Sequence, residues 1–107
     1  MNVRSPFTIL FDEGIEAHLA PIERYERSAI LDAIEEQLTH EPIGMTRNRM
    51  PLRIPNSIGA TWEFRCGINN RYRVFYDVDI EDCIVVVLAV SHKVGNRLVI
   101  GVEEFNL

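Results

Sequence analysis

The sequence is poor in cysteine and has no long apolar run, and each absence excludes a class of protein. Its two cysteines are too few and too widely spaced for a disulfide framework or a zinc site. No apolar run approaches the roughly 18 residues of a membrane span, and the N-terminus lacks the basic-then-apolar order of a signal peptide. There is no glycine-rich phosphate loop either. We therefore expect a cytoplasmic protein with reduced thiols, no membrane contact, no metal and no cofactor.

Length and composition favour one ordered domain. The chain has 107 residues, of which 47% are hydrophobic and 25% are charged, as is ordinary for a globular protein. This length supports a single core and is too short for two. We therefore treat residues 1–107 as one domain.

The charge is unevenly distributed along the chain. The formal net charge of −5 by itself argues against nucleic acid as a partner. Residues 1–46, however, hold three arginines against nine acidic residues, whereas residues 47–73 hold six arginines against one glutamate. The sequence thus predicts a basic patch beside an acidic body.

Three consecutive segments, at 61–67, 71–79 and 83–93, have the patterns of antiparallel strands. In the first two, large apolar side chains alternate with charged ones, so that Glu63, Arg65 and Arg73 fall on one face and the aromatic residues on the other. The third segment has no polar residue between 84 and 90, which predicts the most buried strand of the sheet.

The hairpins that join these segments predict which charges meet. A turn at 67–71 that keeps both apolar sets on one side places Arg65 directly opposite Arg73. A second turn at 79–82 brings the end of the third strand, which carries Ser91, His92 and Lys93, to the same end of the sheet as the turn at 67–71. With an even-numbered turn His92 falls on the arginine face and Lys93 on the other, whereas a turn one residue longer exchanges them.

The remaining segments complete an α+β fold. Residues 7–11 have strand character, residues 12–19 predict a short helix, and residues 21–38 form an amphipathic helix that ends before Pro42. Residues 41–60 read as an irregular connection, and residues 98–102 as an edge strand or a docked tail. We expect an N-terminal strand and two helices packed on one face of a mainly antiparallel, three- to four-stranded sheet.

The residues that carry a family resemblance lie in the predicted strands. They are Trp-Glu-Phe-Arg at 62–65, Tyr-Arg-Val-Phe-Tyr-Asp-Val-Asp at 72–79 and Ile-Val-Val-Val-Leu-Ala-Val-Ser-His-Lys at 84–93. Together with the order of the elements, they resemble the toxins of RelE/ParE-type toxin–antitoxin modules, over most of the chain. The loop at 47–52 and the tail at 95–101 resemble a particular, poorly characterised branch of that family.

The resemblance implies a small cytoplasmic toxin that is held inactive by a cognate antitoxin. RelE-like members cleave mRNA in the ribosomal A site without a metal, whereas ParE-like members share the fold and poison DNA gyrase. Fold alone does not separate the two activities. We favour a RelE-like endoribonuclease that inhibits translation, and we keep a gyrase poison and an inactive, antitoxin-binding relative as alternatives.

Candidate catalytic residues follow from the chemistry of metal-free RNA cleavage. This reaction needs a base for the 2′-hydroxyl, cations around the phosphorane and an acid for the departing 5′-oxygen. Arg65 and Arg73 suit the cationic role, and both match basic positions of the family. His92 is suited to proton transfer near neutral pH, Lys93 lies near another cationic position of the family, and Glu63 is an alternative base.

Two positions depart from the family pattern. Glu63 stands where the family has a further basic residue, and Val99 stands where several RNA-cleaving members have a C-terminal tyrosine. Cleavage would therefore have to use His92 or Glu63 in place of that tyrosine.

Five further arginines are predicted to contact RNA or the antitoxin, and we expect an acidic antitoxin segment to lie over the arginine face. The alternative is that these arginines only solubilise the protein, that the two central arginines form ordinary surface ion pairs and that His92 caps a strand end. The five residues are Arg47, Arg49, Arg53, Arg71 and Arg97.

Overall fold

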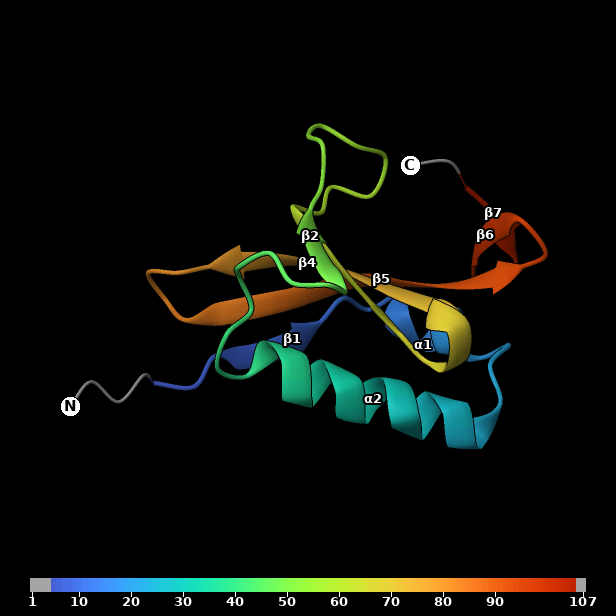
Figure 1. The fold of residues 1–107 in the computed structure, drawn as a ribbon, viewed down its shortest axis with the longest axis horizontal. Helices are drawn as coiled ribbons and strands as arrows, with labels where there is room; N and C mark the ends of the chain where they lie inside the picture. The colour runs from blue at the N-terminus through green and yellow to red at the C-terminus, as the bar shows by residue number, and fades with distance from the viewer. Residues whose placement is uncertain (1–4, 106–107) are drawn as a thin grey trace.

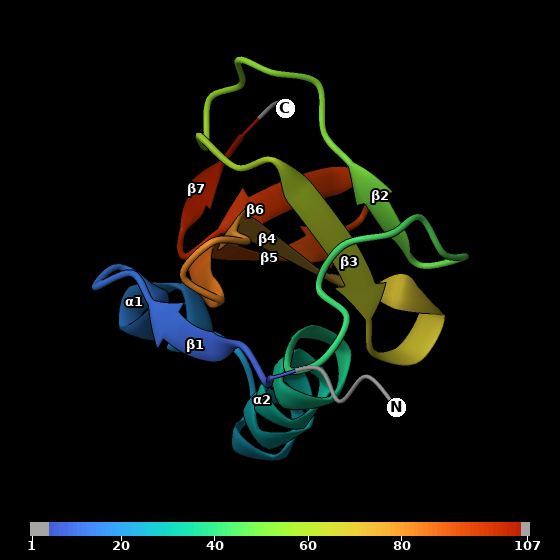
Figure 2. The ribbon, with the colours of Figure 1, turned by 90° about the vertical axis from the view of Figure 1, so that its left-hand side faces the viewer.

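Two helices cover one face of a twisted sheet, and a long loop and the C-terminal segment lie on the other side (Figures 1 and 2). The computed structural model describes residues 5–105. The helices are α1 (Ile15–Leu19) and α2 (Arg24–Leu38), and a single 3-10 turn, η1, spans Ile68–Asn70. The strands are β1 (Thr8–Phe11), β2 (Arg49–Pro51), β3 (Trp62–Cys66), β4 (Tyr72–Asp79), β5 (Ile84–Val94), β6 (Arg97–Ile100) and β7 (Glu103–Glu104).

The sheet has the strand order β2-β3-β4-β5-β6-β7, and all these neighbours are antiparallel. β1 pairs in parallel with the first half of β5, whereas β6 pairs with its second half. The predicted α+β class is confirmed. The predicted N-terminal strand and the three central strands are present, and the short strands β2, β6 and β7 extend the sheet to seven. β6 confirms the strand alternative for the C-terminal segment, although β7 and not β6 forms the edge of the sheet.

The main core lies between α2 and the sheet. The apolar stripe of α2 buries Ile30, Ile34 and Leu38 against strand residues that include Phe64 and Tyr76. Each fully buried aliphatic side chain of this kind contributes about 1.5–3 kcal/mol. The hydroxyl of Tyr76 donates to the carbonyl of Pro42 at 2.6 Å, so that this polar group is satisfied where it is buried. This core therefore holds the helices against one face of the sheet.

A second, smaller core lies on the opposite face of the sheet. Phe75 and Ala89 are buried there beneath the loop at 52–60 and beneath Phe105, whose ring meets that of Phe75 edge-on at 5.8 Å. The side chain of Asn56 organises the loop, because its oxygen accepts from the backbone of Ile58 while its nitrogen donates to the carbonyl of Ala60 at 2.8 Å. The loop therefore packs on this face and covers part of it.

A β-bulge in β5 corrects one predicted orientation. The turn between β4 and β5 has four residues, 80–83, and is even-numbered as assumed, but the register shifts between Phe75 and Tyr76, so that Leu88 is an extra residue. Every later side chain of β5 therefore changes face. His92 pairs with Tyr72 and lies on the helix side of the sheet, not on the arginine face as predicted for an even turn. α1 supports the strand just beyond the bulge, where the backbone N–H of Val90 donates to Nδ1 of His18 at 3.3 Å.

Candidate anion-binding site

Arg65 and Arg73 lie directly opposite each other on β3 and β4, as the alternation predicted. The hairpin that sets this register begins at Gly67, which has φ +84° and lies so close to the ring of Tyr72 that a Cβ atom would approach it to 2.5 Å. Only glycine fits this position without displacing the ring. The turn therefore fixes two like charges side by side on the face of the sheet away from the helices.

Glu63 offsets the repulsion between the two arginines. Its carboxylate lies 3.6 Å from a guanidinium nitrogen of Arg65 and 3.9 Å from one of Arg73. The side chain of Glu63 is only 3% exposed, whereas those of Arg65 and Arg73 are 34% and 23% exposed. The carboxylate is thus buried against two cations that are themselves partly exposed.

The end of β5 adds a third cation to this face. Ser91 lies opposite Arg73, and its hydroxyl donates to the backbone carbonyl of Arg73 at 3.5 Å. Lys93 is two residues further along the strand and therefore shares the face of Ser91. Its backbone N–H donates to the carbonyl of Arg71 at 3.1 Å, and its side chain is exposed. Because of the bulge, the structure brings Lys93, and not His92, to the arginine pair.

His92 lies in different surroundings. It lines a hollow of about 250 Å³ on the helix side, together with Tyr72, Arg71 and residues at the start of α2. Burial, and then the charge of Arg71, lower the pKa of His92. Burial, together with a hydrogen bond to Glu26, raises the pKa of Tyr72 to about 12. Neither group faces the arginine pair, so neither is placed to move a proton there.

Arg49 also departs from the surface role predicted for it. It is only 5% exposed, and its Nη2 donates to the backbone carbonyl of Gln37 at 2.9 Å and to the side-chain oxygen of Gln37 at 2.8 Å. Gln37 lies in the last turn of α2, where carbonyl groups lack helical partners and a cation is favourable. Arg49 therefore joins β2 to the end of α2 and is not a surface contact for RNA or antitoxin.

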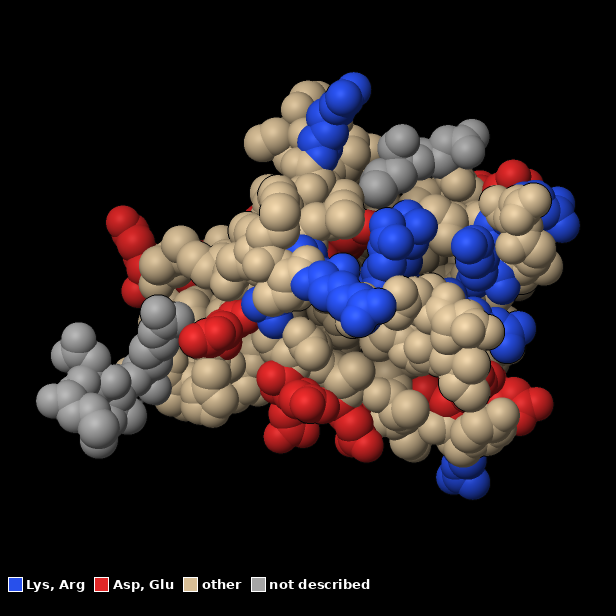
Figure 3. Space-filling view, viewed as in Figure 1, with Lys and Arg blue, Asp and Glu red and all other residues tan. Residues whose placement is uncertain are grey.

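The four other predicted binding arginines are exposed. Arg97 is paired with Glu104 at 3.5 Å, in an ion pair whose two side chains are 63% and 52% exposed. Figure 3 shows that lysine and arginine side chains gather above α2, around the middle of the view, whereas acidic side chains follow α2 along its lower edge. The predicted contrast between a basic patch and an acidic body is therefore visible on this face. The four residues are Arg47, Arg53, Arg71 and Arg97.

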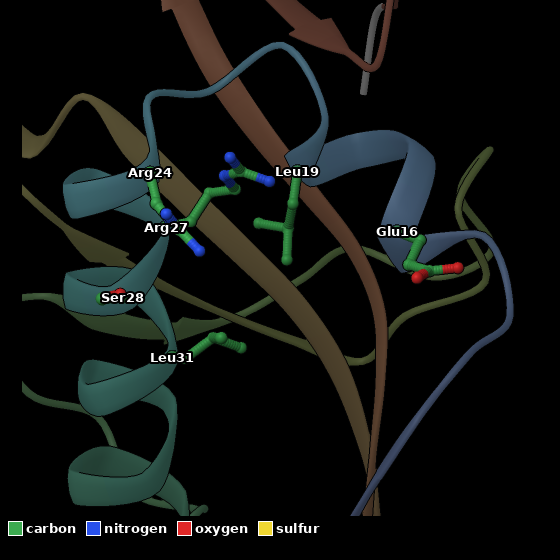
Figure 4. A pocket seen from close by; sticks show the side chains of 6 residues that line it. All are labelled: Glu16, Leu19, Arg24, Arg27, Ser28 and Leu31. Atoms are coloured by element: carbon green, nitrogen blue, oxygen red, sulfur yellow. The ribbon is translucent and has the colours of Figure 1, made fainter.

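A hollow between the two helices lies on the opposite side of the sheet from the arginine pair. It measures about 500 Å³ and lies between α1 and α2, where Arg27 extends toward Leu19 (Figure 4). Within residues 5–105, no group of three or more histidine, cysteine or acidic side chains is arranged to hold a metal ion. No helix in the same range is long and apolar enough to cross a membrane.

The structure thus combines an N-terminal strand and two helices on one face of the sheet with opposed arginines on the other. A chain in the crystal structure of the toxin–antitoxin complex RelBE2 from Mycobacterium tuberculosis is similar over 87% of this chain and 98% of that chain, with a TM-score of 0.68 and 27% sequence identity. No protein-family model and no curated protein matches this chain. The structural likeness confirms the resemblance to RelE/ParE-type toxins.

Proposed function

We propose that this chain is the toxin of a type II toxin–antitoxin pair and that it cleaves mRNA on the ribosome through the face that carries Arg65 and Arg73. The observation that carries the proposal is the opposed arginine pair, held by a buried carboxylate on a sheet face that the helices leave open. The likeness to a chain of a toxin–antitoxin complex supports the same conclusion.

The arginine pair suits the electrostatic part of RNA cleavage. In this reaction the 2′-oxygen attacks the adjacent phosphorus and loses its proton to water, while the bond to the 5′-oxygen breaks and that oxygen takes up a proton from the protein. Negative charge grows on the phosphoryl oxygens, and fixed cations at that position are usually the largest contribution of such a site. Arg65 and Arg73 supply these cations, and Lys93 is the exposed group that we assign to the leaving oxygen.

The cognate antitoxin is the proposed inhibitor of this face. An acidic antitoxin segment laid over Arg65, Arg73 and Lys93 would neutralise them and block RNA. We expect charge reversal at Arg65 and Arg73 to weaken the complex in a pull-down with the antitoxin. A complex that is insensitive to both reversals would contradict this placement.

One observation favours the second candidate, a toxin-fold protein without nuclease activity. None of the tyrosines or histidines within residues 5–105 lies on the arginine face, and Glu63 is buried against the guanidinium groups. Such a protein would act by binding alone, on DNA gyrase or on the antitoxin. The two candidates differ in whether mRNA is cut.

The test is to induce the wild-type chain and Arg73→Ala without antitoxin, and to measure growth and map new mRNA 5′ ends by primer extension. We expect the wild type to arrest growth and cut mRNA, and Arg73→Ala to do neither. Arg24→Ala, an exposed arginine on α2, is the matched control and should behave like the wild type. Growth arrest without new 5′ ends would select a non-nuclease target, and no arrest would select an inactive, antitoxin-binding protein.

A further inference from the structure

Glu63 has a geometry that suits neither a surface ion pair nor a catalytic base. Its side chain is 3% exposed and faces two guanidinium groups, at 3.6 and 3.9 Å. Its Oε2 atom is buried and has no hydrogen-bond partner among the described residues. A base must reach the proton that it removes, and a carboxylate that is 3% exposed is not accessible to a ligand on this face. The carboxylate therefore acts on the arginines and not on the substrate.

Burying a carboxylate is costly unless cations compensate it, and two opposed arginines repel each other unless an anion lies between them. The cluster of Glu63, Arg65 and Arg73 meets both conditions and leaves one positive charge in excess. An internal RNA phosphodiester carries one negative charge, whereas a terminal or inorganic phosphate carries close to two at pH 8. The excess charge of these three side chains thus equals that of one phosphodiester, and Lys93, which we assign to the leaving oxygen, adds a separate positive charge on the same face.

We propose that Glu63 is a positioning and specificity residue, which holds Arg65 and Arg73 opposite each other and limits their excess charge to that of one phosphodiester. This inference rests on the proposed RNA-binding face and adds the type of phosphate that the face prefers. It assigns no proton transfer to Glu63. Removal of its charge leaves two uncompensated guanidinium groups, which strengthens anion binding and favours doubly charged phosphate.

The first measurement is the binding of a labelled 2′-O-methyl RNA oligonucleotide, which the chain cannot cut, by fluorescence anisotropy over a range of salt. We expect Glu63→Gln to bind roughly fivefold more tightly at 0.1 M salt. The plot of log Kd against log salt should steepen by about 0.7, the change for one further phosphate contact on a single strand. Unchanged or weaker binding by Glu63→Gln, with an unchanged salt slope, would overturn the proposal.

Two variants separate this role from a structural one. Glu63→Asp keeps the charge and should restore the wild-type salt slope, which loss of fold at this position would not do. Glu104→Gln also frees an arginine from a glutamate at 3.5 Å, but that pair is exposed, so that we expect less than a twofold change in RNA binding. An equal gain in Glu104→Gln and Glu63→Gln would mean that net charge alone matters, and would contradict the proposal.

A second probe does not depend on the proposed function. We expect inorganic phosphate at pH 8 to raise the melting temperature of Glu63→Gln more than that of the wild type, because at a given concentration a ligand that binds more tightly stabilises the folded state more. This result would support the role of Glu63 even if the wild type neither binds nor cuts RNA, which would refute only the proposed function. An equal response of both proteins to phosphate would overturn the role of Glu63.

Discussion

The two faces of the sheet differ in what holds them together. The helix face is built from aliphatic and aromatic side chains that are almost fully buried, among them Ile34, Phe64 and Tyr76. The other face has a small apolar cluster around Phe75, next to a compensated cluster of charges. Burial is thus concentrated on one side, and the exposed polar groups of the other remain free for a ligand. The comparison predicts that stability and binding depend on different residues.

The largest expected effect on stability comes from the helix face. Ile34→Ala removes a fully buried side chain of α2 and should lower the free energy of unfolding by about 2–5 kcal/mol. Phe105→Ala removes a partly buried ring on the other face and should cost about 1–2 kcal/mol, mostly through its edge-on contact with Phe75. Urea unfolding of both variants measures the difference. Equal losses would show that the small cluster is as important to the fold as the main core.

Arg49 gives an intermediate effect, because it binds within the fold and not at the surface. Arg49→Ala should cost about 1.5–3 kcal/mol, since it removes two charge-assisted hydrogen bonds to Gln37. Arg53→Ala, at an exposed arginine of the loop, is the control and should change stability by less than about 0.5 kcal/mol. If Arg49→Ala unfolded at the same urea concentration as the wild type, the hydrogen bonds that join β2 to α2 would contribute nothing to stability.

The smallest effect concerns pH. Burial lowers the pKa of both His18 and His92, so the folded state binds fewer protons than the unfolded chain below about pH 6.5. This part of the stability is complete above that pH and is lost as pH falls through the lowered pKa values. We expect the urea midpoint to be lower at pH 5.5 than at pH 7.5. The double variant His18→Gln/His92→Gln should show a smaller fall, and an unchanged fall would assign it to other groups.

The sequence predicted those parts of the structure in which polar and apolar residues alternate. The opposed positions of Arg65 and Arg73 follow directly from the alternation in β3 and β4. The bulge at Leu88 lies in an all-apolar run, where an extra residue leaves no trace in the pattern. The prediction for His92 and Lys93 was therefore wrong in orientation, although the turn length was even.

The position of Arg49 was missed for a related reason. β2 has only three residues, ends in a proline and has no alternation that would reveal it in an irregular connection. Only its pairing with Phe64 places Arg49 on the helix side. The burial of Glu63 was likewise missed, because the alternation in β3 predicts the face on which Glu63 lies and not how deeply its side chain is buried. Its one available signal was a single acidic residue among six arginines in residues 47–73.

The extra residue in β5 also has a genetic meaning. Loss of the single codon for Leu88 would restore a regular ladder and leave each later residue of β5 opposite its present partner, so that His92 would still lie on the helix side and Lys93 on the side of the arginines. Homologous chains that lack this codon would thus differ in length within β5 and keep the same side chains on the arginine face.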